Sequence, residues 1–227
     1  MPLNVVNIST VANRIGRPFT MIPVTAVGDL ALSVYICQGL IDWHKHLDED
    51  ELFLVHEGVI ALETERGSLT LHSEELAVVP KGVGHRSGST LRSVALLIRP
   101  AVLTDRKNGH RRLQTLDTDQ QLEKVRLVRV GQTLTAPYQA ATLARVEDFD
   151  LVLVNAQDFG PNETAPGHGA LWLVVRGSVG IETSEGARAR LEAGELTVIP
   201  KGMGYRLHAA QPALALTMAR EIEGSKQ

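Results

Sequence analysis

The chain has 227 residues, of which 44% are hydrophobic and 22% are charged, as is usual for one large or two small folded domains. Its formal net charge is −3, so the positive face that nucleic-acid binding needs is not expected. No apolar run approaches the roughly 18 residues of a membrane span, and the first residues lack a signal-peptide pattern. Cys37 is the single cysteine, which excludes an internal disulfide. The sequence therefore predicts a cytoplasmic protein without a membrane or nucleic-acid partner.

The first hundred residues are expected to form mostly short strands. A short helix is predicted over Asn7–Arg14, at the front of this half. Cys37 follows a strand-like run and is expected to be a small buried residue, not a reactive thiol. The strands are runs rich in Val, Ile and Leu that alternate with turn signals about every ten residues. They are predicted over Leu30–Ile36, Glu51–Val55, Val59–Thr64, Leu69–Leu71, Leu76–Val79 and Val94–Ile98.

Four residues suited to metal binding lie at or between these predicted strands. Residues two apart in a strand project to one face, so His44 and His46 aim both imidazoles in the same direction. Glu51 follows after a tight turn, and His85 follows the bend at residues 80–84. Three imidazoles and one carboxylate suit a divalent Fe, Mn, Ni, Zn, Co or Cu ion and suit Mg or Ca poorly. On an octahedral ion, four such ligands leave two positions for water, substrate or dioxygen.

A polar segment separates the two halves of the chain. Residues 105–116 are predicted to be a linker, and their basic cluster is expected to be solvated. A second helix is predicted over Asp117–Lys124, with Asp117 or Thr118 as its cap.

The second half repeats the first. Residues 195–206 match residues 75–86 at eight of twelve positions with an offset of 120, while upstream residues such as Gly58 and Gly177 match with an offset of 119. One residue was gained between the two blocks. A repeat of this length matches a small domain that closes its own core. The sequence predicts an all-β protein with two tandem domains, 1–104 and 117–227.

The motifs of the first half resemble those of the cupin superfamily. His44-Lys45-His46 with Glu51 and Gly58 is similar to the first cupin motif, and Pro80-Lys81-Gly82 with His85 is similar to the second. This resemblance implies two small antiparallel β-barrels of jelly-roll type with little helix, as in a bicupin. It also implies one metal ion in the first barrel. The implied ligands are His44, His46, Glu51 and His85.

The second copy departs from the motif. The offsets place Glu163, Ala165, Ala170 and Tyr205 at the four ligand positions. Alanine offers no ligand atom, so the second barrel is expected to be free of metal, and His168 is not expected to restore the cluster.

Other polar residues are given structural roles. The remaining histidines expected at the surface are His56, His72, His110 and His208. Lys81 and Arg86 recur as Lys201 and Arg206, which favours a scaffold or surface role for them. The candidate pocket-wall residues are Gln38, Phe53, Val55, Leu96 and Ile98. The catalytic residues are unknown, because neither motif contains a clear second acid or base.

The resemblance implies an enzyme acting on a small organic substrate that chelates the metal through two oxygens. With iron the expected reaction is that of a dioxygenase, and with Mn, Ni or Zn that of a Lewis-acid isomerase or decarboxylase. The alternative is a non-catalytic module that binds or senses a small molecule or sugar. A third hypothesis is that the second barrel binds its own ligand near Glu163, Trp172 and Tyr205. The resemblance also implies pairing of barrels through their sheet edges, so a homodimer is favoured, while a monomer in which the two copies satisfy each other stays open.

Overall fold

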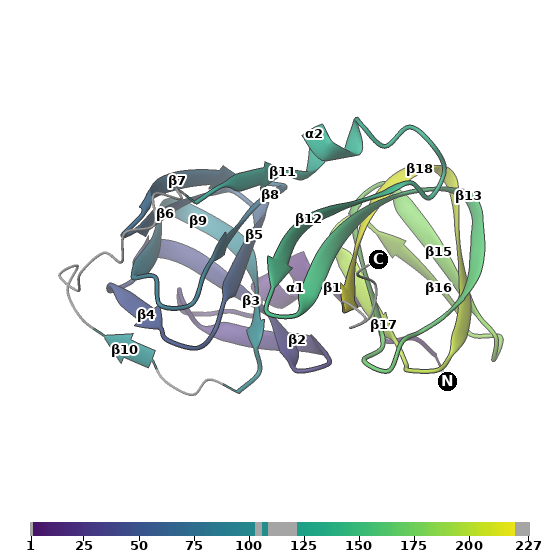
Figure 1. Ribbon diagram of the computed structural model, residues 1–227, viewed down its shortest axis with the longest axis horizontal. Helices are drawn as coiled ribbons and strands as arrows, with labels where there is room; N and C mark the ends of the chain where they lie inside the picture. The colour runs from purple at the N-terminus through teal and green to yellow at the C-terminus, as the bar shows by residue number, and fades with distance from the viewer. Residues whose placement is uncertain (1, 103–105, 109–121, 221–227) are drawn as a thin grey trace, which may run out of the picture. The chain divides into compact units, whose positions relative to one another are not determined.

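The computed structural model describes residues 2–102, 106–108 and 122–220, which divide into two compact units (Figure 1). The amino-terminal unit spans Asn7–Leu127, and the carboxy-terminal unit begins at Val128 and also takes in the residues up to Val6. Each described unit is built on one antiparallel sheet, so the predicted all-β class is confirmed. No helix in the described part of the chain is long and apolar enough to cross a membrane.

The amino-terminal unit contains each of the six predicted strands. Its sheet runs in the order β10-β4-β9-β5-β8-β11, with β3 and β6 also paired to β9 and with β2 and β7 attached to them. Its elements are α1 (Ile8–Ala12), β2 (Met21–Val27), β3 (Leu30–Leu40), β4 (His44–His46), β5 (Glu51–Glu57), β6 (Val59–Thr64), β7 (Gly67–His72), β8 (Glu75–Val79), β9 (His85–Pro100), β10 (Arg106–Asn108) and β11 (Lys124–Arg126).

Strand β9 joins the two faces of this unit. Its first residues pair with β4 and β6, and its last residues pair with β3 and β5. The register with β3 shifts between Cys37 and Gly39, where the pairing changes from one half of β9 to the other. The sheet therefore closes around a common interior, where buried apolar side chains pack together, Cys37 among them. This burial confirms the prediction made for Cys37.

The carboxy-terminal unit repeats this plan with β13 and β18 as its long strands. Its sheet runs in the order β1-β17-β14-β18-β13-β12, with β15 attached to β18 and β16 to β15. Its elements are β1 (Val6–Asn7), α2 (Leu127–Gly131), β12 (Ala140–Val146), β13 (Phe149–Thr164), β14 (Ala170–Arg176), β15 (Ser178–Thr183), β16 (Arg188–Glu192), β17 (Glu195–Ile199) and β18 (Gly204–Arg220).

The backbone carries the repeat independently of side-chain identity. Residues with positive φ recur at an offset of 119 until the start of β7 and at an offset of 120 after it. The gained residue therefore lies in the hairpin between β15 and β16. The recurring pairs are Phe19 and Tyr138, Gly28 and Glu147, Gly39 and Asp158, Gly58 and Gly177, Gly67 and Gly186, Glu74 and Gly194, and Gly82 and Gly202.

Short strands near the ends of the two units pair with the sheets of those units. Strand β11 pairs with β8 in the amino-terminal unit, and β1 pairs with β17 in the carboxy-terminal unit. Residues 106–108 of the predicted linker form β10, whose backbone pairs with β4. Residues 103–105 and 109–121 lie outside the described part of the chain, as do the predicted helix start at Asp117 and His110.

One predicted helix is present, and the other gives way to a strand where it is described. Helix α1 lies inside the predicted range, and the side chain of Asn7 caps it by accepting a hydrogen bond of 2.9 Å from the Thr10 amide. Lys124, the predicted end of the second helix, begins β11 instead. The second helix of the structure, α2, starts three residues later, at Leu127.

Candidate metal centre

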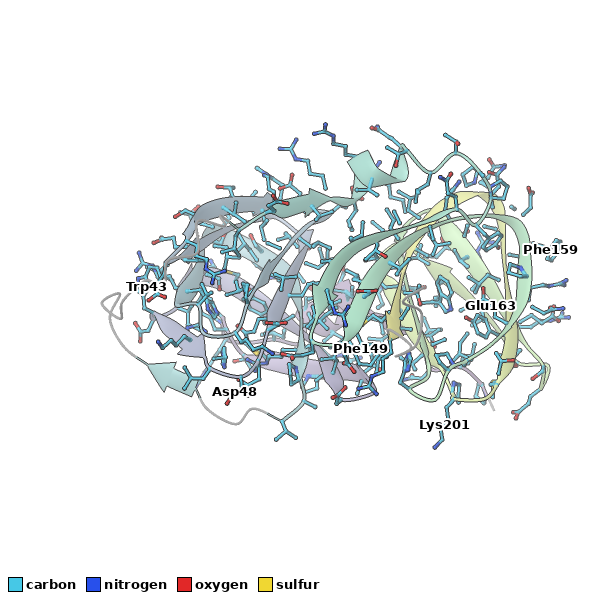
Figure 2. The ribbon with its side chains drawn as sticks, in the orientation of Figure 1. Trp43, Asp48, Phe149, Phe159, Glu163 and Lys201 are labelled. Atoms are coloured by element: carbon cyan, nitrogen blue, oxygen red, sulfur yellow. The ribbon has the colours of Figure 1, made fainter. Side chains whose placement is uncertain are left out.

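The structure brings the four predicted ligand residues together. Adjacent strands supply three of them, because His44 pairs with His85 across β4 and β9 and His46 lies two residues along β4. Glu51 opens β5. One donor atom from each side chain lies within 4.8 Å of the others, and His44 is half-buried while the other three side chains are buried. Figure 2 shows Trp43 and Asp48, which flank this region in the chain, on the part of the unit that carries β4.

Backbone carbonyls orient two of the imidazoles. His44 Nδ1 lies 2.8 Å from the carbonyl oxygen of Asp42, and His85 Nδ1 lies 3.0 Å from that of Val83. A carbonyl oxygen can only accept, so each Nδ1 carries the proton and each Nε2 faces the cluster as a potential ligand atom.

The His85–Glu51 contact has the geometry of a cation site. His85 Nε2 lies 2.9 Å from Glu51 Oε2, although the Nδ1 of the same ring already donates to Val83. Two acceptors on one imidazole require either a proton on each nitrogen or a cation between Nε2 and the carboxylate. A metal ion bound by both atoms satisfies the second requirement.

Glu51 is held in its charged form. Burial opposes its ionisation, but the hydrogen bond and charge of His85 and the charges of His46 and Arg99 outweigh burial and lower its pKa to about 2. The Arg99 guanidinium donates to Oε1 over 2.7 Å, and His46 Nε2 lies 3.4 Å from the same oxygen. The carboxylate is thus available as a ligand across the physiological pH range.

His46 supplies an imidazole that the rest of the site leaves unsatisfied. Both ring nitrogens are buried without a hydrogen-bond partner among the described residues. Burial lowers the pKa of His46 and favours the neutral ring, whose lone pair can bind a metal. Glu49 is also buried, with its carboxylate 3.7 Å from His46 Nδ1. The donor set of three imidazoles and one carboxylate therefore fits a divalent transition-metal ion.

The strand register corrects the predicted pocket wall. Phe53 and Val55 face the interior as predicted, and the Phe53 ring lies edge-on to His85 at 6.1 Å. Their partners across the ladder are Leu97 and Ala95, so these two line the interior and the predicted Leu96 and Ile98 face the opposite side. Gln38 is exposed, because it lies beyond the register shift that follows Cys37.

Three groups near the cluster escaped the sequence prediction. Arg99 lies two residues after Leu97 on β9, so its side chain projects to the same face as those of Ala95 and Leu97. The sequence alone does not show that this face points inward, because that depends on the pairing of β9 with β5. Glu49 lies three residues after His46 in a run of acidic residues, and nothing in the sequence distinguishes it from its acidic neighbours. Tyr35 fills the interior, and burial raises the pKa of its hydroxyl above the usual value, so the hydroxyl keeps its proton.

The remaining histidines have ordinary roles in the described structure. His56 is half-buried, not exposed, and its Nε2 lies 2.9 Å from the Ser9 hydroxyl. The side chain of His72 is exposed, as predicted, and His208 is exposed and stacks on Phe159.

Two of the four recurring basic residues are exposed lysines, and the other two are arginines that contact neighbouring side chains. Lys81 and Lys201 are exposed, and the half-buried Arg86 pairs with Glu63 over 2.7 Å. Arg206 lies over the Phe159 ring. These contacts agree with the scaffold or surface role that their recurrence favoured.

The equivalent positions in the carboxy-terminal unit keep the backbone and change the chemistry. Glu163 pairs with Tyr205 across β13 and β18, as His44 pairs with His85. The Gly202 amide donates to the Ala165 carbonyl over 2.8 Å, as the Gly82 amide donates to the His46 carbonyl over 2.6 Å. Ala165 and Ala170 are buried and offer no ligand atom.

Comparisons with known proteins agree with this architecture. No family model matches the sequence. The chain is 30% identical over 93 residues to the uncharacterized protein YdbB of Bacillus subtilis (strain 168), a match that covers 40% of this chain and 82% of YdbB. A cupin 2 conserved barrel domain protein from Leptotrichia buccalis is similar in structure, with a TM-score of 0.72, 11% identity and coverage of 97% of this chain and 98% of that chain.

A second group of similar structures comes from one enzyme. Salicylate 1,2-dioxygenase from Pseudaminobacter salicylatoxidans has a TM-score of 0.77, with 12% identity and coverage of 96% of this chain and 84% of that chain. A mutant of that enzyme in complex with gentisate has a TM-score of 0.73, with 12% identity and coverage of 98% of this chain and 86% of that chain.

Proposed function

We propose that this chain, which has the fold of the cupin barrels it resembles in structure, binds one divalent transition-metal ion in its amino-terminal unit and oxidises a small organic substrate with dioxygen. The proposed ligands are His44, His46, Glu51 and His85. The observation that carries the proposal is the meeting of their four donor atoms within 4.8 Å. Three of the four side chains are buried, where such groups need a partner.

The residues of the site prepare the centre for metal and substrate. The carbonyl oxygens of Asp42 and Val83 fix the rings of His44 and His85. Arg99 orients the Glu51 carboxylate and, with the histidines, keeps it ionised. A bound ion would supply Lewis acidity and, as iron, the electron transfer that dioxygen chemistry needs.

The interior favours a small substrate that binds through two oxygens. On an octahedral ion, these four protein ligands would leave two positions for other ligands. Phe53, Val55 and Leu97 belong to the buried apolar cluster of this unit, and the Phe53 ring lies edge-on to His85. Because the buried Tyr35 hydroxyl keeps its proton, it can donate a hydrogen bond but cannot act as a base near neutral pH. The structural similarity to a salicylate dioxygenase supports aromatic compounds with neighbouring oxygens as the first substrates to test.

The test combines metal analysis with oxygen consumption. Protein purified anaerobically and loaded with Fe(II) is assayed by elemental analysis and by an oxygen electrode with salicylate, gentisate and catechol. We expect one metal per chain and substrate-dependent oxygen uptake in the wild type, and loss of both in His46→Ala. His72→Ala replaces an exposed histidine and is expected to behave as the wild type.

Three outcomes would overturn parts of the proposal. Wild-type protein that takes up no metal would exclude the metal centre. Metal-loaded protein that binds these compounds without turnover would exclude the enzyme and favour the binding or sensing module. Turnover without oxygen uptake would exclude the dioxygenase and indicate Lewis-acid isomerisation or decarboxylation. The homodimer and the bicupin division at residues 104 and 117 stay predictions.

A further inference from the structure

The carboxy-terminal unit contains a cavity of about 620 Å³ at the position that corresponds to the metal cluster of the first unit. Glu163, Ala170 and Tyr205, three of the four positions equivalent to the metal ligands, line it. The small side chain of Ala170 leaves room where Glu51 stands in the first unit. The volume lies within the range of about 300 to 1,000 Å³ that is typical of small-molecule sites.

Two polar groups in the wall of the cavity are buried without a hydrogen-bond partner among the described residues. The indole Nε1 of Trp172 is one, and this residue is only 4% exposed. Burial and Glu163 raise the pKa of Tyr205, and the nearby Trp172 indole opposes this rise, but the geometry of the Trp172–Tyr205 contact falls short of a hydrogen bond. The other is Nε2 of His168. The wall thus presents one donor from Trp172 and, since burial lowers the pKa of His168 and favours its neutral ring, one nitrogen that can accept.

The charges around the cavity disfavour an anionic ligand. Glu163 lies at an exposed position of the lining and accepts a short hydrogen bond of 2.5 Å from the buried Tyr205 hydroxyl. Arg220 also lines the cavity, but its guanidinium donates to the Asp148 carboxylate and stacks on Phe149, so its charge is offset. Glu163 remains the lining carboxylate without a cationic partner in the ion pairs of the described residues.

We propose that this cavity binds an uncharged ring compound that carries a hydroxyl group and a carbonyl or amide group. The carbonyl oxygen accepts from the Trp172 indole N–H, and the hydroxyl donates to Glu163 or His168. The rings of Trp172 and Tyr205, which lie edge-on with centroids 6.4 Å apart, both line the cavity, and each offers aromatic surface against which a ring can pack. An anionic ligand of the same shape is rejected by the Glu163 carboxylate.

The test uses the two tryptophans of the chain. In a Trp43→Phe background, Trp172 is the sole tryptophan and reports binding in the carboxy-terminal unit. The probe is 4-hydroxybenzamide, and its anionic counterpart of the same shape is 4-hydroxybenzoate. We expect 4-hydroxybenzamide to change the Trp172 emission saturably and to bind about tenfold more tightly than 4-hydroxybenzoate. Neither compound has a hydroxyl group next to its carbonyl group, so neither can chelate a metal through a phenol oxygen and a carbonyl oxygen.

Substitutions separate recognition from general charge effects. Glu163→Gln keeps the acceptor for Tyr205 and removes the charge, so it is expected to reduce the preference to less than about threefold. Glu182→Gln removes the charge of an exposed carboxylate of β15 that pairs with Arg188 and does not line the cavity, and it is expected to keep the preference. Ala170→Leu fills the cavity and is expected to abolish binding. Its near-ultraviolet circular dichroism checks that the unit still folds.

The proposal is overturned if no probe gives a saturable change in the wild-type background. Equal affinity for the two probes, or a preference lost equally in Glu182→Gln, would also overturn it. The same titration in His46→Ala is expected to give unchanged affinity. That variant separates this inference from the metal chemistry proposed for the first unit, because either can fail alone.

Discussion

At the scale of single residues, the metal cluster depends on how each imidazole is turned. His44 and His85 are each held by a carbonyl two residues earlier, at Asp42 and Val83. Such short-range bonds fix the tautomer as well as the direction of the ring, because the acceptor demands the proton on Nδ1. His46 has no such carbonyl, and a carboxylate lies beside it instead. This carboxylate, that of Glu49, lies 3.7 Å from His46 Nδ1, which is longer than a hydrogen bond.

We predict that Glu49→Ala weakens metal binding by about 10- to 100-fold. The carboxylate lies 3.7 Å from His46 Nδ1, so its removal deletes a negative charge beside the proposed cation and the acceptor nearest to the ring nitrogen that would carry the proton when Nε2 binds the metal. Competition with a chromophoric chelator measures the affinity.

The matched control for Glu49 is its neighbour in the same turn. Asp48→Asn removes one negative charge from an exposed side chain and is expected to change the affinity by less than about threefold. An equal loss in both variants would show that Glu49 acts through general charge and not through His46.

The ligand set could be predicted from the sequence because it depends on spacing alone. Alternation in a strand places His44 and His46 together without knowledge of the fold. The wall could not be predicted in the same way, since its inward face depends on which residue of β9 lies opposite Phe53. Moving that register by one residue exchanges Leu97 for Leu96. Arg99 was missed for the same reason.

At the scale of elements, the turn between β5 and β6 is held against the long strand β9. Gly58 has a φ of +87°, and a Cβ there would lie 2.4 Å from the Ser93 hydroxyl. That hydroxyl accepts from the Val59 amide and donates to the Val59 carbonyl, each over 3.0 Å, and so ties the start of β6 to the middle of β9. The turn and the strand are therefore locked together.

We predict that Gly58→Ala lowers the free energy of unfolding by about 1 to 3 kcal/mol, through backbone strain and displacement of Ser93. Urea denaturation measures this change. Gly16→Ala serves as the control, because a Cβ at the exposed Gly16 meets no atom within 4 Å. If the two variants were equally stable, the Ser93 contact would not constrain the turn.

Strand β11 is fastened to its neighbour by a buried carboxylate. Glu75 on β8 accepts from Lys124 and Arg126 of β11, each over 2.9 Å, and from the His72 amide. Burial raises the pKa of Glu75, but the His72 and Lys124 hydrogen bonds outweigh burial and lower it. A carboxyl whose pKa is lower in the folded state stabilises that state above its unfolded pKa of about 4.3, and the effect is lost as the pH falls through the folded value.

We predict that Glu75→Gln lowers the free energy of unfolding by about 1 kcal/mol at neutral pH. The difference from the wild type is expected to shrink as the pH is lowered from about 6 to about 3. Urea denaturation across this range, followed by Trp43 emission in a Trp172→Phe background, measures it. Glu182→Gln, at an exposed pair, is the control. A difference that stays constant with pH would contradict the assignment to ionised Glu75.

Several elements were beyond a prediction from local sequence. The predicted strands are apolar runs, whereas β10 and β11 are short, polar and held by pairing with β4 and β8. The predicted strand Val94–Ile98 is the buried part of β9, whose first half is polar and exposed in places. Pairing with distant strands determines that β10 and β11 form and how far β9 extends, and a local sequence pattern carries no information about that pairing.

At the scale of the whole molecule, the repeat has an unexpected chain path. Each copy begins with a short strand followed by a short helix, β1 with α1 and β11 with α2. The strand of each copy pairs in one unit, and most or all of the helix belongs to the other. Residues 2–6 therefore complete the carboxy-terminal unit, although they are the most distant from it in sequence. The repeat itself was predictable from identity, but this exchange of leading strands leaves no mark in the sequence.

The exchange predicts that trimming the amino terminus destabilises the carboxy-terminal unit first. Deletion of residues 2–5 removes Leu3 from the apolar core of that unit and removes the Asn4 carbonyl, which accepts over 2.8 Å from the buried Thr197 hydroxyl. The expected loss is about 2 to 4 kcal/mol, from lost burial and an orphaned hydroxyl. Trp43 and Trp172 lie in different units, so two single-tryptophan proteins report the urea midpoints separately. We expect the larger fall at Trp172. A larger fall at Trp43 would mean that the first residues support their own half of the sequence.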